Sequence, residues 1–293
     1  MEILIFGAGS LGSLVGGLCA REHSVTLVGR DPHIAAVRES GLAVEGAVDF
    51  ATHTEARTTV PERADLAFVT VKSFDTPAAG RALADCDPEI TCSLQNGLGN
   101  EELLAAQLDT VLAGICTYGA RLASPGRVEC TGIGEIALGA PDGGSSAAAE
   151  RAVEALQSAD IDAVHDDGMP KRLWRKLAVN AGINPTTALA GVENGALADG
   201  PLHDVASEAA REVARVAREQ GIELAEGEAV AALESVVEAT ARNTSSMAQD
   251  VEAGTKTEID AINGAVVDRA ESRVPVNRTL AALVRARERG YPD

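Results

Sequence analysis

The residues of this chain best suited to proton-transfer chemistry lie between positions 173 and 184. If this segment is a helix, Lys176, Asn180 and Asn184 fall along one edge, because side chains four residues apart share a face. Lysine is rare here and occurs only at positions 72, 171, 176 and 256, among 25 lysines and arginines. An ammonium group can release a proton near neutral pH, whereas a guanidinium cannot. The segment predicts an acid–base site, although a solvated polar face with a chance lysine would have the same spacing.

A glycine-rich turn follows the first apolar run of the chain. Residues 2–6 are expected to form a buried strand, and a helix is expected to end near Ala20. Between them lies a G-x-G-x-x-G motif made of Gly7, Ala8, Gly9, Ser10, Leu11 and Gly12. Its glycines allow a tight turn, close approach of a pyrophosphate and close helix packing, and the N–H groups of the helix can bind phosphate. With a second strand expected at residues 24–28, the segment predicts dinucleotide binding, the alternative being a turn without nucleotide.

The residues after the second strand bear on the choice of cofactor. Arg30 is positioned to accept the 2'-phosphate of NADP, and a carboxylate at this point would hold the ribose hydroxyls of NAD. Arg30 therefore favours NADPH, while its neighbour Asp31 leaves NADH open. Two other interpretations remain, in which Arg30 is an ordinary surface arginine and Asp31-Pro32 begins a helix that Asp31 caps.

Composition limits the classes of partner. A chain of 293 residues with 45% hydrophobic content is long enough for two globular domains. Its 44 acidic and 25 basic residues give a net charge of -19, so nucleic acid and anionic membranes are not expected partners. Excess carboxylate with scarce lysine and few aromatics is typical of proteins adapted to high salt, and we expect a halophilic source.

Several other classes of protein are also not expected. Residues 3–20 carry no charge, but glycines at 7, 9, 12, 16 and 17 interrupt them and no basic segment precedes them, so neither a signal peptide nor a membrane span is predicted. Five cysteines without a C-x-x-C pair indicate reduced thiols in a cytoplasmic protein, with Cys19, Cys92 and Cys116 in the core. The histidines have no metal-ligand spacing and no G-x-S-x-G motif occurs, which argues against a metal site or a serine hydrolase.

The order of the expected elements predicts an α/β protein. Further strands are expected at residues 65–71, 89–94, 110–118, 126–130, 135–138 and 161–164, with a helix at 147–158. They indicate a doubly wound Rossmann-type sheet domain over residues 1–167, which ends at the turn of residues 166–170. Lys72 and Asn96 follow two of these strands, and ligands of open parallel sheets bind beyond the carboxyl ends of strands. We therefore expect Lys72 and Asn96 near cofactor and substrate; their alternatives are a loop lysine and a plain turn at Asn96-Gly97.

Residues 168–293 are expected to form an all-helical domain. The predicted helices are residues 173–190 with a kink at Pro185, 201–221, 228–242, one that begins at 243–246, 258–271 and 277–289. Ser246 with Gln249, and Thr255 with Glu258, have the spacing of a capping box, so helix capping is expected for both pairs. A hydroxyl at a helix amino terminus can also receive a carboxylate, which keeps a binding role open.

Together these motifs resemble one family, the ketopantoate reductases, also called 2-dehydropantoate 2-reductases. The similarity spans nearly the whole chain in the right order. It rests on the glycine turn, Lys72, Asn96-Gly97, residues 173–180 with Asn184-Pro185, and the blocks at residues 243–250 and 257–264. The helical blocks are far more specific than the glycine turn.

The resemblance implies that NADPH reduces 2-dehydropantoate, a small 2-oxo acid, to D-pantoate, a step of pantothenate and coenzyme A biosynthesis. It makes Lys176 the general acid and Glu258 the acceptor of the substrate hydroxyl, with Asn180 and Asn184 alongside. Asn243 and Ser246 would hold the substrate carboxylate. Lys72 and Asn96 would lie near the nicotinamide, and Arg30 near the 2'-phosphate.

Other functions stay open at this point. One is a related NAD(P)-dependent reductase of another branched 2-oxo acid, and another is a sugar-acid oxidoreductase of the wider hydroxyacid dehydrogenase group. A third is a non-catalytic NADP-sensing protein, which would bind cofactor without turnover. The sequence also leaves open whether the chain forms a homodimer.

Overall fold

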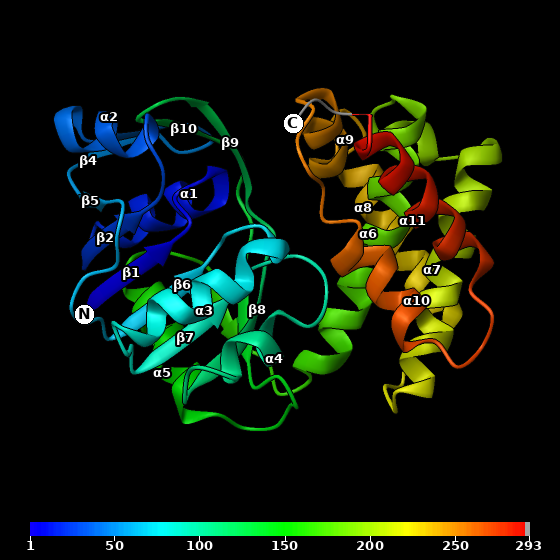
Figure 1. Cartoon of the computed structure of the whole chain (residues 1–293), viewed down its shortest axis with the longest axis horizontal. Helices are drawn as coiled ribbons and strands as arrows, with labels where there is room; N and C mark the ends of the chain where they lie inside the picture. The colour runs from blue at the N-terminus through cyan, green and yellow to red at the C-terminus, as the bar shows by residue number, and fades with distance from the viewer. Residues whose placement is uncertain (291–293) are drawn as a thin grey trace. The chain divides into compact units, whose positions relative to one another are not determined.

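The computed structural model describes residues 1–290, which fold into two units (Figure 1). The first unit comprises residues 1–95 and 100–169, and the second comprises residues 96–99 together with the chain from 170 onward. Residues 96–99, which we expected in the first domain, pack with the second unit. The backbone N–H of Leu98 donates to the carbonyl of Ala261 over 3.1 Å, which fixes this loop to the helical part of the chain.

An eight-stranded sheet forms the centre of the first unit. Its strands, in spatial order, are β12 (Ala163–His165), β11 (Ile136–Gly139), β8 (Val111–Cys116), β7 (Ile90–Ser93), β6 (Leu66–Val69), β1 (Glu2–Phe6), β2 (Ser24–Val28) and β5 (Glu55–Arg57). Neighbours from β8 to β5 pair in parallel, and β11 pairs antiparallel with β8. The chain starts near the middle of the sheet and winds outward in both directions, so the predicted doubly wound Rossmann-type fold is confirmed.

A second, four-stranded sheet was not predicted. Its order is β4 (Phe50–Thr52), β3 (Leu42–Gly46), β10 (Arg127–Gly132) and β9 (Gly119–Ser124). The expectation that residues 126–130 join the main sheet was wrong, because β10 pairs with β3 and β9. Val128 and Cys130 are buried while Arg127 is exposed. This alternation indicates a strand with one covered face, whereas a parallel strand of the main sheet has both faces covered.

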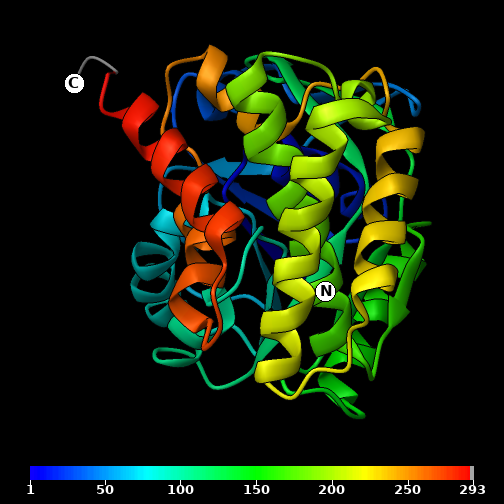
Figure 2. The ribbon, with the colours of Figure 1, turned by 90° about the vertical axis from the view of Figure 1, so that its right-hand side faces the viewer.

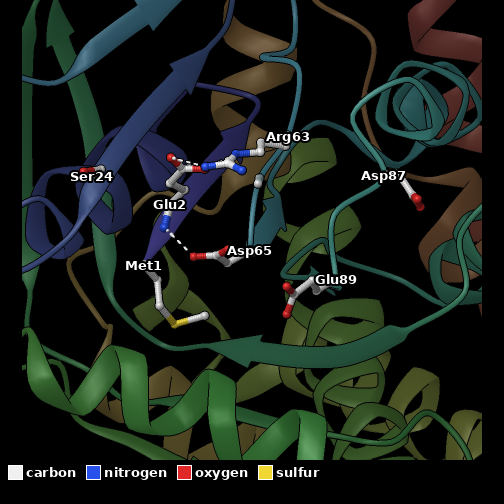
Figure 3. A pocket seen from close by; sticks show the side chains of 8 residues that line it. Met1, Glu2, Ser24, Arg63, Asp65, Asp87 and Glu89 are labelled. Atoms are coloured by element: carbon white, nitrogen blue, oxygen red, sulfur yellow. Dashed lines mark hydrogen bonds and ion pairs between the residues drawn. The ribbon is translucent and has the colours of Figure 1, made fainter.

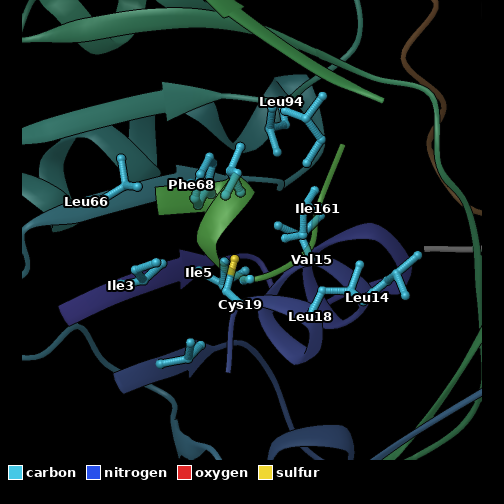
Figure 4. Packing of buried hydrophobic residues seen from close by; sticks show 14 of the residues in the cluster. Ile3, Ile5, Leu14, Val15, Leu18, Cys19, Leu66, Phe68, Leu94 and Ile161 are labelled. Carbon is cyan, nitrogen blue, oxygen red and sulfur yellow. The ribbon is translucent and has the colours of Figure 1, made fainter. Parts of the chain in front are cut away.

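The helix after the glycine motif lies against both sheets. The helices of this unit are α1 (Ser10–Cys19), α2 (His33–Ser40), α3 (Thr76–Ala84), α4 (Asn100–Ala105) and α5 (Ala147–Ser158), with a 3₁₀ turn η1 (Ser73–Asp75). α1 contacts β1 and β2 of the main sheet and β3, β9 and β10 of the second sheet. Its residues Leu14, Val15 and Leu18 pack into one apolar cluster with Ile5 and Phe68 (Figure 4). This packing fixes the start of α1 relative to the strand ends.

The second unit is all helical over the residues described, as predicted. It contains α6 (Met169–Ala190), the 3₁₀ turn η2 (Asn194–Leu197), α7 (Gly200–Glu219), α8 (Glu226–Ala239), α9 (Ser246–Glu252), the π-helix η3 (Asp260–Gly264), α10 (Ala265–Arg269) and α11 (Pro275–Glu288). Figure 2 shows α7 and α11 (yellow and red), which contact each other. Among the described helices, none has the length and apolar character that a membrane span needs.

Helix α6 runs without a break through Pro185. A proline ring has no N–H, so residue 185 cannot donate to the carbonyl of residue 181. The side-chain amide of Asn263 donates to the Ala181 carbonyl over 3.0 Å instead. The carbonyl that Pro185 leaves without its helical donor is therefore satisfied from another segment.

Candidate active site

The glycine turn has a backbone that larger residues could not adopt. Gly7 has φ +114°, and a Cβ there would lie 2.7 Å from the backbone nitrogen of Val71. A Cβ on Gly12 would lie 2.3 Å from the carbonyl oxygen of Gly7. The N–H groups of Gly7 and Ala8 donate to the carbonyl of Val28 over 2.9 and 2.8 Å, which closes the turn against β2.

The amino terminus of α1 has the features of an anion site. Its N-cap residue is Gly9, and no side chain caps the helix there. The first N–H groups of a helix have no acceptor within the helix, and the helix dipole favours negative charge at this end. A Cβ on Gly9 would meet no atom closer than 4.0 Å, so the approach to these groups is open. The hydroxyl of Ser10 accepts from the N–H of Leu122 over 3.0 Å and ties the helix start to β9.

Arg30 and Asp31 have different partners. The Arg30 guanidinium is 87% exposed and pairs with the carboxylate of Asp75 over 3.0 Å. Oδ1 of Asp31 accepts from the N–H of Ala35 over 3.0 Å, in the first turn of α2. Asp31 thus bonds the first turn of α2 from the position before its N-cap residue, Pro32.

Two polar residues follow strands β6 and β7 in the first unit. Lys72 is half-buried, and its carbonyl accepts from the N–H of Asp75 over 2.8 Å at the start of η1. The Gln95 amide donates to the carbonyl of Val71 over 3.1 Å and to the hydroxyl of Thr76 over 2.7 Å. Gln95, which the sequence analysis did not single out, joins the ends of the two strands.

In the second unit, three of the predicted site residues form one hydrogen-bonded group. Nδ2 of Asn96 donates to Oε2 of Glu258 over 3.2 Å, and Nδ2 of Asn180 lies 3.5 Å from Oδ1 of Asn96. The Glu258 side chain is nearly buried, with 6% exposure, while Asn96 and Asn180 are half-buried. The side chains of Asn96, Asn180 and Glu258, far apart in the sequence, thus lie within hydrogen-bond distance of one another in a chain of two contacts.

Lys176, Asn180 and Asn184 occupy successive turns of α6, as their spacing predicts. Lys176 and Asn180 are half-buried, and Asn184 is 7% exposed. The face is therefore not a fully solvated one, and it brings an ammonium group onto the same helix edge as an amide that contacts the Asn96–Glu258 pair.

The structure corrects both predicted capping boxes. Ser245, not Ser246, caps α9 by accepting from the N–H of Ala248 over 3.2 Å. The buried Ser245 hydroxyl also lies 2.7 Å from that of Thr187 on α6, whereas Ser246 is exposed. Adjacent serines offer the same local chemistry, and the contact with α6 selects one of them.

The second capping box is also absent among the described contacts. The hydroxyl of Thr255 donates to the carbonyl of Asp250 over 3.2 Å, and Thr257 accepts from the N–H of Ile259 over 3.2 Å. The carboxylate of Glu258 faces Asn96 across 3.2 Å rather than the Thr255 backbone. The spacing of Thr255 and Glu258 therefore does not produce a reciprocal capping box.

Asn194 is a further polar residue that the sequence analysis missed. Its N–H donates over 3.0 Å to the carbonyl of Asn243, an exposed residue, and its Nδ2 donates to Thr240 over 2.9 Å. Its Oδ1 is buried without a partner among the described residues. The only sequence signal was an Asn-Gly pair, which is also a common turn.

A separate pocket of about 530 Å³ contains none of these residues (Figure 3). Its lining includes Glu2, Arg63, Asp65, Asp87 and Glu89, at the amino ends of the strands. Arg63 pairs with Glu2 over 3.1 Å, and the N–H of Glu2 donates to Asp65 over 2.8 Å. Ligands of parallel sheets bind at the opposite, carboxyl ends, so this pocket is not the candidate site.

Cysteine and metal chemistry find no support in the described part of the chain. Cys19 and Cys92 are fully buried, as expected, and Cys116 is half-buried. Burial raises the pKa of the Cys19 thiol to about 12, so it is not a nucleophile at neutral pH. Over residues 1–290, no cluster of histidine, cysteine or acidic side chains could hold a metal ion.

Comparison with known proteins places these features in a family. The profile described as "Ketopantoate reductase PanE/ApbA" matches residues 3–143, and "Ketopantoate reductase PanE/ApbA C terminal" matches residues 169–288. A 2-dehydropantoate 2-reductase of Archaeoglobus fulgidus is 42% identical, over 99% of this chain and 98% of the relative. The chain belongs to the ketopantoate reductase family.

Solved structures of this family have the same fold. A ketopantoate reductase from Ralstonia eutropha is 31% identical with a TM-score of 0.88, over 99% of both chains. D-mandelate dehydrogenase, in its ternary structure with NADH and anilino(oxo)acetate, is 26% identical with a TM-score of 0.93, over 99% of both chains. Structural similarity at this level therefore extends beyond ketopantoate reductases to a dehydrogenase of another 2-hydroxy acid.

Proposed function

We propose that this protein reduces 2-dehydropantoate to D-pantoate with NADPH, in pantothenate and coenzyme A biosynthesis. The observation that carries the proposal is the hydrogen-bonded group of Asn96, Asn180 and Glu258 in a chain of this family. Its member Asn180 lies one turn after Lys176 on α6. These residues supply one proton donor, one carboxylate and two amides, which suit a substrate with a carbonyl and a hydroxyl.

The first unit fits a nicotinamide dinucleotide. The open, uncapped amino terminus of α1 and the tight turn at Gly7 would hold the pyrophosphate, along the backbone of residues 7–12. Arg30 would meet the 2'-phosphate, and Lys72 and Asn96 would lie near the nicotinamide. Arg30 at this position favours NADPH, and one oxygen of the exposed Asp31 carboxylate is used by the N–H of Ala35.

Lys176 provides the proton for the reduction. When bound, the cofactor supplies a hydride to the carbonyl carbon of the substrate. The oxygen of that carbonyl gains negative charge, which the ammonium of Lys176 stabilises and then neutralises by giving up a proton from Nζ. The acid need only be present in its ammonium form before the transfer, and solvent restores it afterwards.

The neighbouring side chains orient the substrate. Glu258 accepts the hydrogen bond of the substrate hydroxyl. The amide of Asn96 holds the Glu258 carboxylate in place by donating to it. Asn180 and Asn184, on successive turns of α6 after Lys176, would complete the set of polar contacts. Asn243 and Ser246 would receive the substrate carboxylate near the amino terminus of α9, where backbone N–H groups favour an anion.

A second candidate is the reduction of another 2-oxo acid. The structural similarity to D-mandelate dehydrogenase, with a TM-score of 0.93, specifically favours testing it. The two activities would share the proton donor and differ in the side chain that the substrate pocket accepts. A non-catalytic NADP-sensing protein would instead bind cofactor without turnover.

The proposal is tested by measuring NADPH oxidation with 2-dehydropantoate in parent, Lys176→Ala and Lys171→Ala proteins. Lys171 is the matched control, because it lies on the same helix but pairs with Glu228 over 2.9 Å. We expect Lys176→Ala to lower kcat by about 10²- to 10⁴-fold, the usual range for a lost general acid. Lys171→Ala should keep kcat, and NADPH affinity measured by fluorescence should be kept in both.

Other substrates and cofactors complete the test. A higher kcat/KM for phenylglyoxylate, or for D-mandelate oxidation with NAD, would favour the second candidate. Cofactor binding without turnover of any 2-oxo acid would contradict the enzymatic proposal. A higher kcat/KM with NADH than with NADPH would contradict the assignment of Arg30.

A further inference from the structure

The buried amide of Asn263 connects the two segments that carry the proposed proton donor and carboxylate. Asn263 lies in η3, five residues after Glu258, and is 0% exposed. Its Nδ2 donates to the carbonyl of Ala181 on α6 over 3.0 Å. Ala181 is the residue after Asn180. We propose that Asn263 is a positioning residue, which holds the Glu258 segment in register with α6; this inference rests on the proposed function.

The carbonyl of Ala181 has no donor within α6 because residue 185 is a proline. In an uninterrupted helix, the carbonyl of Ala181 would accept from the N–H of residue 185. Proline has no N–H, and its place in α6 leaves this carbonyl for a donor from outside the helix. Asn263 supplies that donor, so the backbone donor missing from α6 determines where η3 attaches.

The orientation of the Asn263 amide is set by a second bond. Nδ2 also donates to Oδ1 of Asn277 over 2.9 Å, and Nδ2 of Asn277 donates to Glu212 over 2.8 Å. Asn277 and Glu212 are both 0% exposed. The carboxylate of Glu212 accepts in addition from the backbone N–H groups of Val276 and Asn277, over 2.9 and 2.8 Å. This network of buried side chains anchors the amide in the start of α11.

The unused half of the Asn263 amide supports the same conclusion. Its Oδ1 is buried without a hydrogen-bond partner among the described residues. A buried acceptor without a donor is unfavourable, so the Oδ1 atom of Asn263 lowers the stability of the folded protein. Both N–H groups of Nδ2 donate hydrogen bonds, one to α6 and one to Asn277. This indicates that asparagine is present here for its two donors.

The backbone of η3 also departs from regular helix near Glu258. The N–H of Gly264 donates to the carbonyl of Ile259 over 2.9 Å, a π-type bond across five residues. Such π-turns are rare and occur frequently at functional sites. The bond from Asn263 attaches this widened turn to α6 from the side.

The test uses Asn263→Ala and Asn263→Asp, with Val266→Ala as the matched control. Val266 is also 0% exposed and lies in the apolar core of the second unit, three residues after Asn263, but its side chain cannot hydrogen-bond. Asp keeps the shape of Asn but, when ionised, cannot donate to the carbonyl of Ala181. We expect both Asn263 variants to raise KM for 2-dehydropantoate at least about tenfold and to lower kcat, with the Kd for NADPH unchanged. Val266→Ala should lower Tm with KM for 2-dehydropantoate unchanged.

Pro185→Ala provides a second test that needs no substrate. The new N–H of residue 185 can bond the carbonyl of Ala181, so Asn263→Ala should lower Tm less in this background than in the parent. Additive losses in Tm, or Asn263 variants that keep the parent KM in an active enzyme, would overturn the positioning role. A parent protein that does not reduce 2-dehydropantoate would contradict the proposed function, and the Tm comparison would still decide the attachment of η3.

Discussion

The side-chain amide of Asn96 donates a hydrogen bond to the carboxylate of Glu258 over 3.2 Å, across 162 residues of sequence. Asn96 directly follows Gln95, whose side-chain amide links the segments after β6 and β7. Glu258 lies two residues before η3 begins. The bond fixes one carboxylate oxygen of a nearly buried side chain. Under the proposed function, Glu258 would therefore present a defined geometry to the substrate hydroxyl.

Replacement of Asn96 by Asp should weaken the enzyme in a pH-dependent way. The variant places a second carboxylate 3.2 Å from Glu258, where two like charges disfavour each other and one group takes up a proton more readily. We expect kcat/KM for 2-dehydropantoate to fall about 10- to 100-fold at neutral pH and to recover partly at lower pH. The pH profile of kcat/KM measures both effects.

The control for this experiment is Asn96→Ala, which removes the donor without adding charge. Its loss of kcat/KM should be nearly independent of pH relative to the parent. Parallel pH profiles of the Asp and Ala variants would show that Asn96 does not set the charge environment of Glu258.

Removal of Arg30 should affect NADPH selectively. Under the proposed function, Arg30→Ala would delete a charge-assisted contact with the 2'-phosphate. We then expect KM for NADPH to rise about 10- to 100-fold while KM for NADH changes little. Arg63→Ala is a matched control, because Arg63 is similarly exposed, at 80%, and pairs with Glu2 in the same way. An equal rise for NADH and NADPH would argue against a phosphate contact.

The stability of the first unit should depend on the neutral form of His33. The N–H of Gly126 donates to Nδ1 of His33 over 3.0 Å, and Nε2 lies 2.9 Å from the hydroxyl of Ser13. Burial lowers the pKa of His33 from its ordinary value of 6.5. The unfolded chain then binds more protons than the folded chain between the two pKa values, so this stabilisation is complete above pH 6.5 and is lost as pH falls through the folded pKa.

Thermal unfolding between about pH 8 and about pH 5.5 measures this dependence. The parent should lose Tm as pH falls, and His33→Asn should have a lower Tm at pH 8 with a shallower slope. His53→Asn, at an exposed histidine of the same unit, should keep the parent slope. An unchanged slope in His33→Asn would assign the acid sensitivity to other groups.

Salt should stabilise this protein. A net charge of -19 makes the folded chain repel itself, and raising KCl from about 0.1 M to about 1 M shortens the Debye length from about 10 Å to about 3 Å. We expect both Tm and kcat to rise over this range. Sucrose strengthens burial without screening charge and should give a smaller gain. A Tm that is highest in dilute buffer would contradict adaptation to high salt.

Long and strongly patterned segments of the fold could be predicted from sequence. Residues 2–20 combine an apolar strand, a glycine turn and an apolar helix, and α6 has a clear helical period. The second sheet could not be predicted, because β4 has only three residues and β3 pairs with β10, more than 80 residues away in the sequence. Local patterns carry no information on such a pairing, and only the alternation in β10 indicated one exposed face.

The candidate site was predictable to a similar degree. The shared helix edge of Lys176, Asn180 and Asn184 follows from spacing alone. The Asn96–Glu258 pair does not, because it depends on tertiary packing, and the sequence pointed to it only through a family resemblance. The capping hydroxyl of α9 was misassigned by one residue, because Ser245 and Ser246 differ in burial rather than in local chemistry.

The bond from Asp31 to the N–H of Ala35 restricts how the coenzyme choice of this protein could be re-engineered. Removal of Arg30 alone would weaken a preference for NADPH without creating one for NADH, because one oxygen of Asp31 already bonds the first turn of α2. A variant designed for NADH would need a newly introduced acidic residue at the end of β2, with Asp31 left in place to bond the first turn of α2.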